Sequence, residues 1–89
     1  MKKIYKYSLA LTDTQFVELP LGAEILTVQM QGDRLCLWAM INTLPEAIKK
    51  NRRIEIIGTG NPVPTGDLKY ISTFQMMGGG LIFHVFENA

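Results

Sequence analysis

Residues 34–42 read RLCLWAMIN, and this run settles the class of fold. Every second side chain in it is apolar, and the positions between hold Cys36, Trp38 and Met40, which are apolar as well. A strand that is apolar on both faces is covered on both faces. We therefore expect one face of this strand to lie on the domain core and the other on a second subunit.

Shorter alternating runs lie on both sides of this segment, separated by turn residues. They span residues 3–11, 16–19, 24–31, 53–58, 69–76 and 81–87. A period of two marks half-buried strands, and short strands at this spacing are typical of sandwiches and small barrels. The chain is therefore predicted to be all-β, a single small β-sandwich or barrel of about six to seven antiparallel strands. Its 89 residues suit one domain, residues 1–89.

Two details of the strands follow from the same alternation. Within residues 24–31, Leu26, Val28 and Met30 alternate with polar residues and are predicted to point inward. The glycines at residues 78–80 separate the last two runs, which are predicted to pair as a hairpin.

The alternation stops in residues 43–52. A proline just inside the segment and Thr43 as a cap suit the start of a helix, so at most one short helix is predicted near residues 44–50. The basic run KKNRR at residues 49–53 is predicted to be a solvated loop.

The apolar content is high for so short a chain. Of the 89 residues, 47% are hydrophobic, whereas a domain of this size buries only about 60% of its unfolded surface. We expect the surplus to form an exposed patch and the protein to be a homo-oligomer, although scattered apolar residues are the alternative. Aromatic and methionine side chains are typical of interfaces. The predicted interface residues are Tyr5, Tyr7, Trp38 and Met40.

The charge and the cysteine content limit the kinds of partner and the cellular compartment that we expect. Nine Lys and Arg against eight Asp and Glu give a net charge of +1, and the basic run lacks interleaved aromatics, so nucleic acid is not an expected partner. No apolar run approaches the roughly 20 residues that span a membrane, and no secretion signal follows residues 1–3. The lone Cys36 favours a reducing compartment, and we expect a cytoplasmic protein.

No residue pattern specifies catalysis. His84 is the single histidine and lies between Phe83 and Val85, where core packing is its expected role. One histidine and one cysteine fall short of a four-ligand metal site, and no carboxylate pair has an informative spacing. The sequence therefore predicts no catalytic residue, no metal site, no cofactor and no enzymatic activity.

The glycine-bearing segment at residues 58–66 admits a ligand-binding interpretation. Its glycines would let the backbone approach an anion, but it lacks the Lys-Ser/Thr of a phosphate-binding loop, and a tight turn is the alternative. If a nucleotide-like ligand binds at a subunit junction, the predicted contacts are Trp38, Arg52, Arg53, Thr59, Asn61 and His84.

Nearly the whole chain resembles a family of small uncharacterised proteins of bacteriophages and prophages. The resemblance rests on residues 3–7 (KIYKY), 25–29 (ILTVQ), 36–39 (CLWA), 58–60 (GTG) and 73–86. Where a histidine often follows the GTG step in that family, this chain has Asn61, which weakens a two-histidine site. The resemblance implies a phage origin and supplies no catalytic or binding residue.

Two hypotheses of function follow. The first is a phage-encoded β module that self-associates and binds a host or phage protein without performing chemistry. The second is a counter-defence protein that sequesters a small nucleotide-like ligand.

Overall fold

The computed structural model describes residues 1–43 and 48–89, which form seven strands and one 3-10 turn. The strands are β1 (Lys2–Ser8), β2 (Thr14–Pro20), β3 (Glu24–Gln31), β4 (Arg34–Asn42), β5 (Lys49–Gly58), β6 (Leu68–Met76) and β7 (Leu81–Asn88), and the turn is η1 (Met77–Gly79). Each strand pair is antiparallel. The prediction of an all-β fold with about six to seven antiparallel strands is confirmed.

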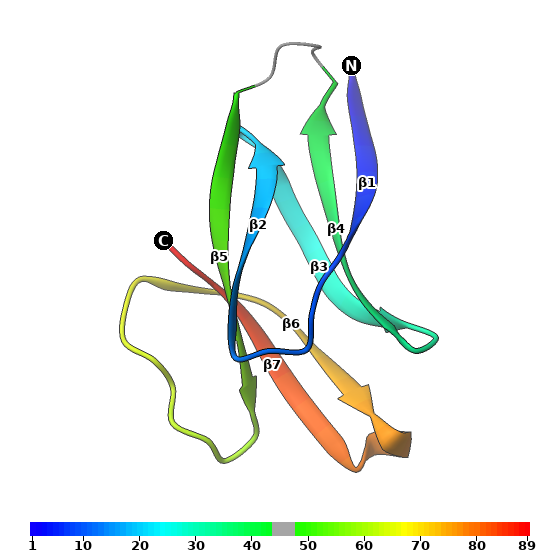
Figure 1. Cartoon of the computed structure of the whole chain (residues 1–89), viewed down its shortest axis with the longest axis vertical. Helices are drawn as coiled ribbons and strands as arrows, with labels where there is room; N and C mark the ends of the chain where they lie inside the picture. Colours follow the sequence, from blue (N-terminus) through cyan, green and yellow to red (C-terminus); the bar gives the residue numbers. More distant parts are fainter. Residues whose placement is uncertain (44–47) are drawn as a thin grey trace.

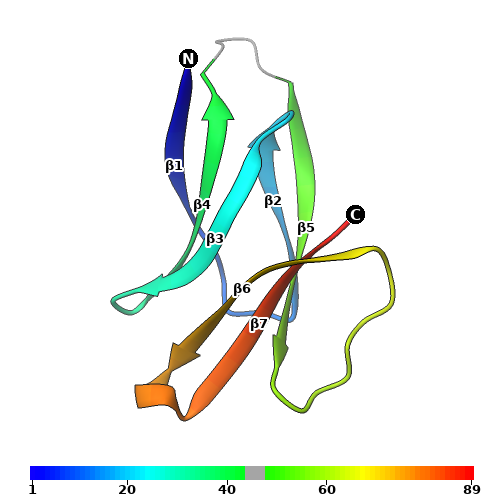
Figure 2. The same cartoon turned by 180° about the vertical axis from the view of Figure 1, so that it is seen from behind.

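The strands form two sheets (Figures 1 and 2). The three-stranded sheet has the order β1-β4-β3, and the four-stranded sheet has the order β2-β5-β7-β6. Their facing sides enclose the apolar core. Its buried members are Val17, Leu19, Ala23, Val28, Leu35, Leu37, Ala39, Ile41, Ile54, Ile56, Phe74 and Val85.

Strand β4 lies in the middle of the three-stranded sheet. Alternate residues from Leu35 to Ile41 are buried in the core. The residues between them, Cys36, Trp38 and Met40, therefore point to the outer face of the sheet. These three side chains form a second apolar stripe of β4, and its role depends on whether another part of the chain or a partner covers the outer face.

A buried serine joins the two sheets where the edge strand β3 meets the edge strand β6, beside a longer bond from the Gln29 amide to the carbonyl oxygen of Thr73 at 3.4 Å. The Ser72 hydroxyl donates to the carbonyl oxygen of Val28 at 2.7 Å and accepts from the amide of Val28 at 3.0 Å. Both residues are buried, so this side chain satisfies backbone groups that no strand pairs. The edges β3 and β6 therefore lie against each other without a strand ladder, whereas β1 and β2 are the outermost strands at the other edges of the two sheets.

The inward direction predicted for Leu26 is wrong. The pairing of β3 with β4 shifts register between Ile25 and Thr27, so Leu26 is the extra residue of a β-bulge opposite Trp38. Ile25 packs against the core in its place, and Leu26 is exposed. Strict alternation cannot reveal a bulge, because the extra residue changes the side on which all earlier residues of the strand lie.

The solvated loop predicted for the basic run is also wrong. Residues 49–53 belong to β5 and pair with β2, with Lys49 opposite Pro20 and Arg53 opposite Phe16. Of the helix predicted near residues 44–50, residues 44–47 lie outside the described part of the chain, and residues 49 and 50 are strand. The run is mostly charged because four of its five residues are exposed, while Arg52 is partly buried.

The predicted hairpin of the last two strands is confirmed, since β6 pairs with β7 along its length. Its tip is the 3-10 turn, in which Met77, Gly78 and Gly79 all have positive φ values. No helix among the described residues is long and apolar enough to cross a membrane.

Candidate functional site

Glu55 is a buried acid on the outer face of the four-stranded sheet. Its neighbours in β5, Ile54 and Ile56, point into the core, so the Glu55 side chain points the opposite way, yet only 1% of the residue is exposed. Thr14 donates a hydrogen bond to its Oε1 at 2.6 Å, and Asn88 donates to its Oε2 at 3.2 Å. These bonds from β2 and β7 offset the cost of burying a charge.

The connection between β5 and β6 encloses this carboxylate. The Asn88 amide that bonds Glu55 also donates to the carbonyl oxygen of Thr65 at 3.2 Å, and the amide of Ala89 donates to the carbonyl oxygen of Asp67 at 3.0 Å. A cleft of about 400 Å³ remains between connection and sheet, called the Glu55 cleft below. It is lined by Asp13, Thr14, Glu55, Ile56, Ile57, Gly58, Asn61, Pro62, Val63 and Pro64.

The charge of the Glu55 cleft does not suit an anion. Burial raises the pKa of Glu55, but hydrogen bonds from Thr14 and Asn88 and the nearby Arg53 outweigh it and hold the pKa below its usual value. The carboxylate is therefore ionised at neutral pH. With Asp13 on the same cleft, a phosphate would meet two negative groups, so this geometry gives the nucleotide interpretation no support.

His84 lies on the same outer face, within a chain of side-chain hydrogen bonds, so the core-packing role predicted for it is wrong. Its Nε2 is 2.8 Å from the hydroxyl of Thr59, and its Nδ1 is 3.1 Å from the hydroxyl of Thr73. The Thr73 hydroxyl is in turn 2.7 Å from that of Tyr70. The structure therefore brings two predicted binding residues, Thr59 and His84, into direct contact.

A carbonyl oxygen at the end of this chain sets the direction of its bonds. The Thr59 hydroxyl donates to the carbonyl oxygen of Ile82 at 3.3 Å, because a carbonyl only accepts. In the neutral tautomer that fits this donation, Thr59 accepts from Nε2–H of His84, and Nδ1 accepts from Thr73. A general base would instead have to take the proton of Thr59. The arrangement orients the imidazole without activating Thr59 as a nucleophile.

Arg52 and Glu87 form a paired bridge on the inner side of the four-stranded sheet, beyond the core. The guanidinium donates through Nε and Nη2 to the two carboxylate oxygens of Glu87, the second at 2.9 Å, and through Nη1 to the carbonyl oxygen of Ala23 at 2.8 Å. The Glu87 bond raises the pKa of Arg52, and the same bond lowers the pKa of Glu87. Arg52 is thus committed to internal partners.

Arg53 follows Arg52 in β5 and consequently lies on the opposite side of the sheet. Its Nε is 3.6 Å from Oε1 of Glu55, and its guanidinium carbon lies 6.0 Å from the ring centre of Phe16. The two arginines predicted to bind one ligand therefore face different surroundings. With Trp38 on the other sheet, Arg52 on the inner side and Arg53 beside Glu55, the six predicted binding residues occupy four separate places. Only Thr59, His84 and the cleft residue Asn61 lie near one end of β5.

The glycines of the connection fit the turn interpretation. A Cβ on Gly58 would lie 2.9 Å from the Asn61 side chain, and the amide of Asn61 donates to the carbonyl oxygen of Gly58 at 3.0 Å. Gly60 between them has a φ of +91°. This tight turn accounts for the GTGN sequence without a bound anion.

The outer face of the three-stranded sheet carries apolar side chains, whereas that of the four-stranded sheet carries hydrogen-bonded polar groups. Opposite residues of paired strands share a face, so the pairing of Met40 with Ile4 in β1 places Ile4 beside Trp38 and Met40. Ile4 is 58% exposed, and Trp38 and Met40 are partly buried. We call the surface made by Ile4, Trp38 and Met40 the open face. Among the described elements, none packs over it.

The chain itself covers the other half of this outer face. Lys6 Nζ donates to Oε1 of Gln31 at 2.6 Å, linking β1 to β3 across the intervening strand β4. Cys36, on the outer face of β4, is only 2% exposed. The second apolar stripe of β4 is therefore partly sheltered within one molecule, and only its Trp38 and Met40 end is left to a further partner.

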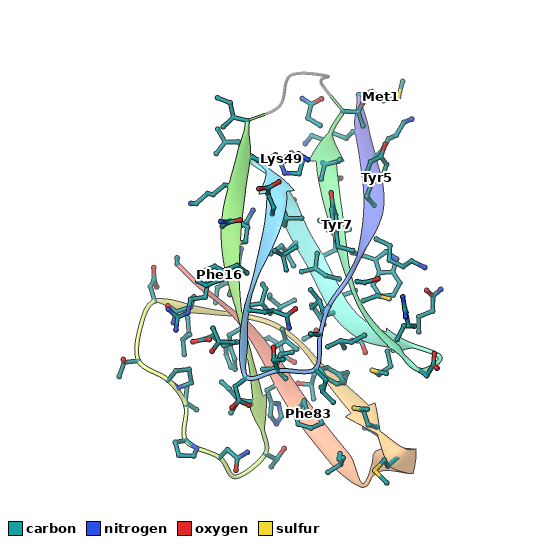
Figure 3. The ribbon with its side chains drawn as sticks, viewed as in Figure 1. Met1, Tyr5, Tyr7, Phe16, Lys49 and Phe83 are labelled. Carbon is teal, nitrogen blue, oxygen red and sulfur yellow. The ribbon has the colours of Figure 1, made fainter. Side chains whose placement is uncertain are left out.

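The predicted interface residues do not form one surface. Tyr5 and Tyr7 pair with Ala39 and Leu37, whose side chains point to the core side, so both tyrosines lie on that side of the free edge β1 (Figure 3). Trp38 and Met40 lie on the outer face. Ile4 was missed, because alternation groups it with Lys6 and Ser8, which look like a polar face.

The described residues contain no group of three or more His, Cys, Asp or Glu side chains that could hold a metal ion.

Comparison with protein-family models matches residues 1–89 to the family described as Domain of unknown function (DUF7352). The chain matches no curated protein and no solved structure.

Proposed function

This chain belongs to the domain family of unknown function DUF7352, and we propose that it is a small β module that binds protein and self-associates through the open face. It performs no chemistry of its own. It is encoded by a bacteriophage or prophage and acts in the cytoplasm of the host. The phage origin is supported by the sequence resemblance of runs such as KIYKY (residues 3–7) and CLWA (residues 36–39).

The observation that carries this function is the uncovered apolar end of the open face. Trp38 and Met40 lie beside Ile4, and no described element covers them. Tryptophan and methionine are enriched at protein interfaces, where large apolar area is removed from water. A protein surface, including that of a second copy, is the natural cover for such a face.

The absence of chemistry is supported by how the polar side chains are engaged. His84 is oriented by hydroxyl groups, Glu55 is bonded by Thr14 and Asn88, and Arg52 is paired with Glu87. Among the described residues, no buried side-chain nitrogen or oxygen lacks a hydrogen-bond partner. Polar groups that are all satisfied internally stabilise a fold and are not poised to bind a transition state.

Light scattering coupled to size exclusion, over a range of protein concentrations, tests self-association. We expect the average mass of the wild-type protein to rise with concentration, and Trp38→Ala to remain a monomer. Phe16→Ala is the matched control, because Phe16 is an exposed aromatic residue on the free edge strand of the other sheet. It should associate like the wild type.

Two results would reject the proposed surface. One is a wild-type protein that stays monomeric at every concentration, and the other is association that Phe16→Ala weakens while Trp38→Ala leaves it intact. Circular dichroism of each variant checks that its strands are retained.

A further inference from the structure

The strand register arranges charges of opposite sign on the two flanks of the open face. Lys2 in β1 pairs with Asn42, and Glu24 in β3 pairs with Met40, so both lie near the same end of β4 and on its outer side. Both residues are exposed. Since β4 is the middle strand, a positive flank and a negative flank border the apolar strip at one end.

This layout is complementary to itself under one particular symmetry. A two-fold axis that runs parallel to β4 through the contact places β1 of one copy over β3 of the other. Residues at one end of the sheet then stay at that end, so Lys2 faces Glu24 of the second copy and the central Trp38 and Met40 meet their own counterparts. A two-fold axis across the strands would place β1 over β1 and would bring no opposite charges together.

We propose that a second copy of this chain packs face to face on the open face, about a two-fold axis parallel to β4, with Lys2 of each copy paired to Glu24 of the other. The inference rests on the proposed self-association and gives it a geometry. Two-fold symmetry provides each ion pair twice. Ile4 lies over the bulge of the second copy, where Leu26 is exposed.

The remaining charges of this outer face limit the contact to one end. Lys6 is bonded to Gln31, whereas Arg34, at the far end of β4, would approach Arg34 of the second copy. Arg34 lies four positions from Trp38 along the strand, or roughly 13 Å. The sheets of the two copies can therefore separate at the Arg34 end while they remain in contact at the Trp38 end. The contact is therefore small, and the dimer should dissociate on dilution.

Charge reversal tests the geometry. Lys2→Glu and Glu24→Lys should each weaken the dimer about tenfold, because each turns two attractive pairs into two repulsive ones. The double variant Lys2→Glu/Glu24→Lys should return the dissociation constant to within about twofold of the wild type, since reversed pairs attract equally. The dissociation constant is measured by sedimentation equilibrium at low salt, where such pairs are least screened.

The outcomes separate the geometry from the proposed function. A dimer that Trp38→Ala abolishes but that charge reversal leaves unchanged, or that the double variant does not restore, overturns the geometry alone. A protein that is monomeric throughout overturns the self-association itself. Glu18→Lys is the control, because Glu18 lies on the other sheet, and it should leave the dissociation constant unchanged.

Discussion

The outer faces of the two sheets each carry side chains that a single layer of strands cannot bury. The chain covers these side chains on one sheet and leaves part of them without a described cover on the other. Over the four-stranded sheet, the connection between β5 and β6 encloses Glu55, which is bonded by Thr14 and Asn88. Over the three-stranded sheet, a Lys6–Gln31 bond shelters Cys36, while Ile4, Trp38 and Met40 have no described cover. Figure 1 shows the long connection between β5 and β6 beside the end of β5.

The difference indicates that the outer face of the four-stranded sheet stabilises the fold, and that the open face of the three-stranded sheet is available to bind a partner. An enclosed carboxylate with its partners in place stabilises the fold, because its loss would leave a cavity and would remove the acceptor of the partly buried Asn88. Trp38 is already partly buried in the single molecule, and a contact on the open face would remove the rest of its apolar area from water. Substitutions on the two faces should therefore affect different properties.

Glu55→Ala should have the largest effect on folding. It removes the acceptor of two hydrogen bonds and leaves a cavity where the buried side chain lay, so we expect the free energy of unfolding to fall by about 3 kcal/mol. Urea denaturation measures the loss. Glu18→Ala is the matched control, because Glu18 and its partner Lys49 are both exposed, and it should cost less than about 0.5 kcal/mol. Equal losses in the two variants would show that the connection does not enclose Glu55 in solution.

Gly66→Ala should have the next largest effect, because a Cβ at this position would lie 2.2 Å from Oδ1 of Asn88. Asn88 would have to move and give up its bonds to Glu55 and Thr65. We expect a loss of about 2 kcal/mol in urea denaturation, the sum of these bonds and a strained φ. Gly60→Ala also has a positive φ but open space around it, and should cost only about 1 kcal/mol. A larger loss at Gly60 than at Gly66 would contradict the enclosing role of Asn88.

Lowering the pH should weaken the four-stranded sheet through its two bonded acids. The folded-state pKa values of Glu55 and Glu87 lie below their unfolded values, so the stabilisation is complete above pH about 4.3 and is lost as the pH falls through the folded pKa. Between pH 6 and pH 3, the free energy of unfolding of the wild type should fall by about 1 kcal/mol more than that of Glu87→Gln. The variant has no group at residue 87 that titrates in this range. Parallel stability profiles for the two proteins, with Glu18→Gln as control, would contradict this linkage.

Lys6→Ala should have the smallest effect on stability and a clear effect on reactivity. The Lys6–Gln31 bond is exposed, so its loss should cost less than about 0.5 kcal/mol. Cys36 beneath it should nevertheless react several-fold faster with a thiol reagent, since access limits a buried thiol. Lys3→Ala, on the core side of β1, should leave the rate unchanged. Unchanged reactivity in Lys6→Ala would mean that something else covers this half of the face.

Much of the fold was predictable because alternation acts locally. Alternation identified residues 34–42 as a strand with two apolar faces, and the glycines at residues 78–80 placed the last hairpin. The bulge at Leu26 and the strand character of residues 49–53 were not predictable, because both depend on pairing with a distant strand. The period of a sequence is read within one strand and does not report how that strand pairs with another.

Less of the candidate site was predictable, for the same reason. Thr59 and His84 were singled out by composition, but nothing in the sequence joins residues 25 positions apart, and Glu55 was missed because its neighbours Ile54 and Ile56 made it look like the solvent side of a strand. Glutamate is rarely fully buried unless it is paired. Its partners Thr14 and Asn88 come from the two strands that flank β5.

The sequence by itself determined that this protein is all-β, that β4 is apolar on both faces, and which side of most strands meets the core. Those properties follow from side-chain period and hydrophobicity, which are read along the chain. Tertiary structure alone decided that Arg52 and Arg53 serve opposite faces, that Ser72 joins the sheets, and that only the Trp38 end of β4 stays uncovered. These depend on strand order and register, which bring together residues that no local pattern connects.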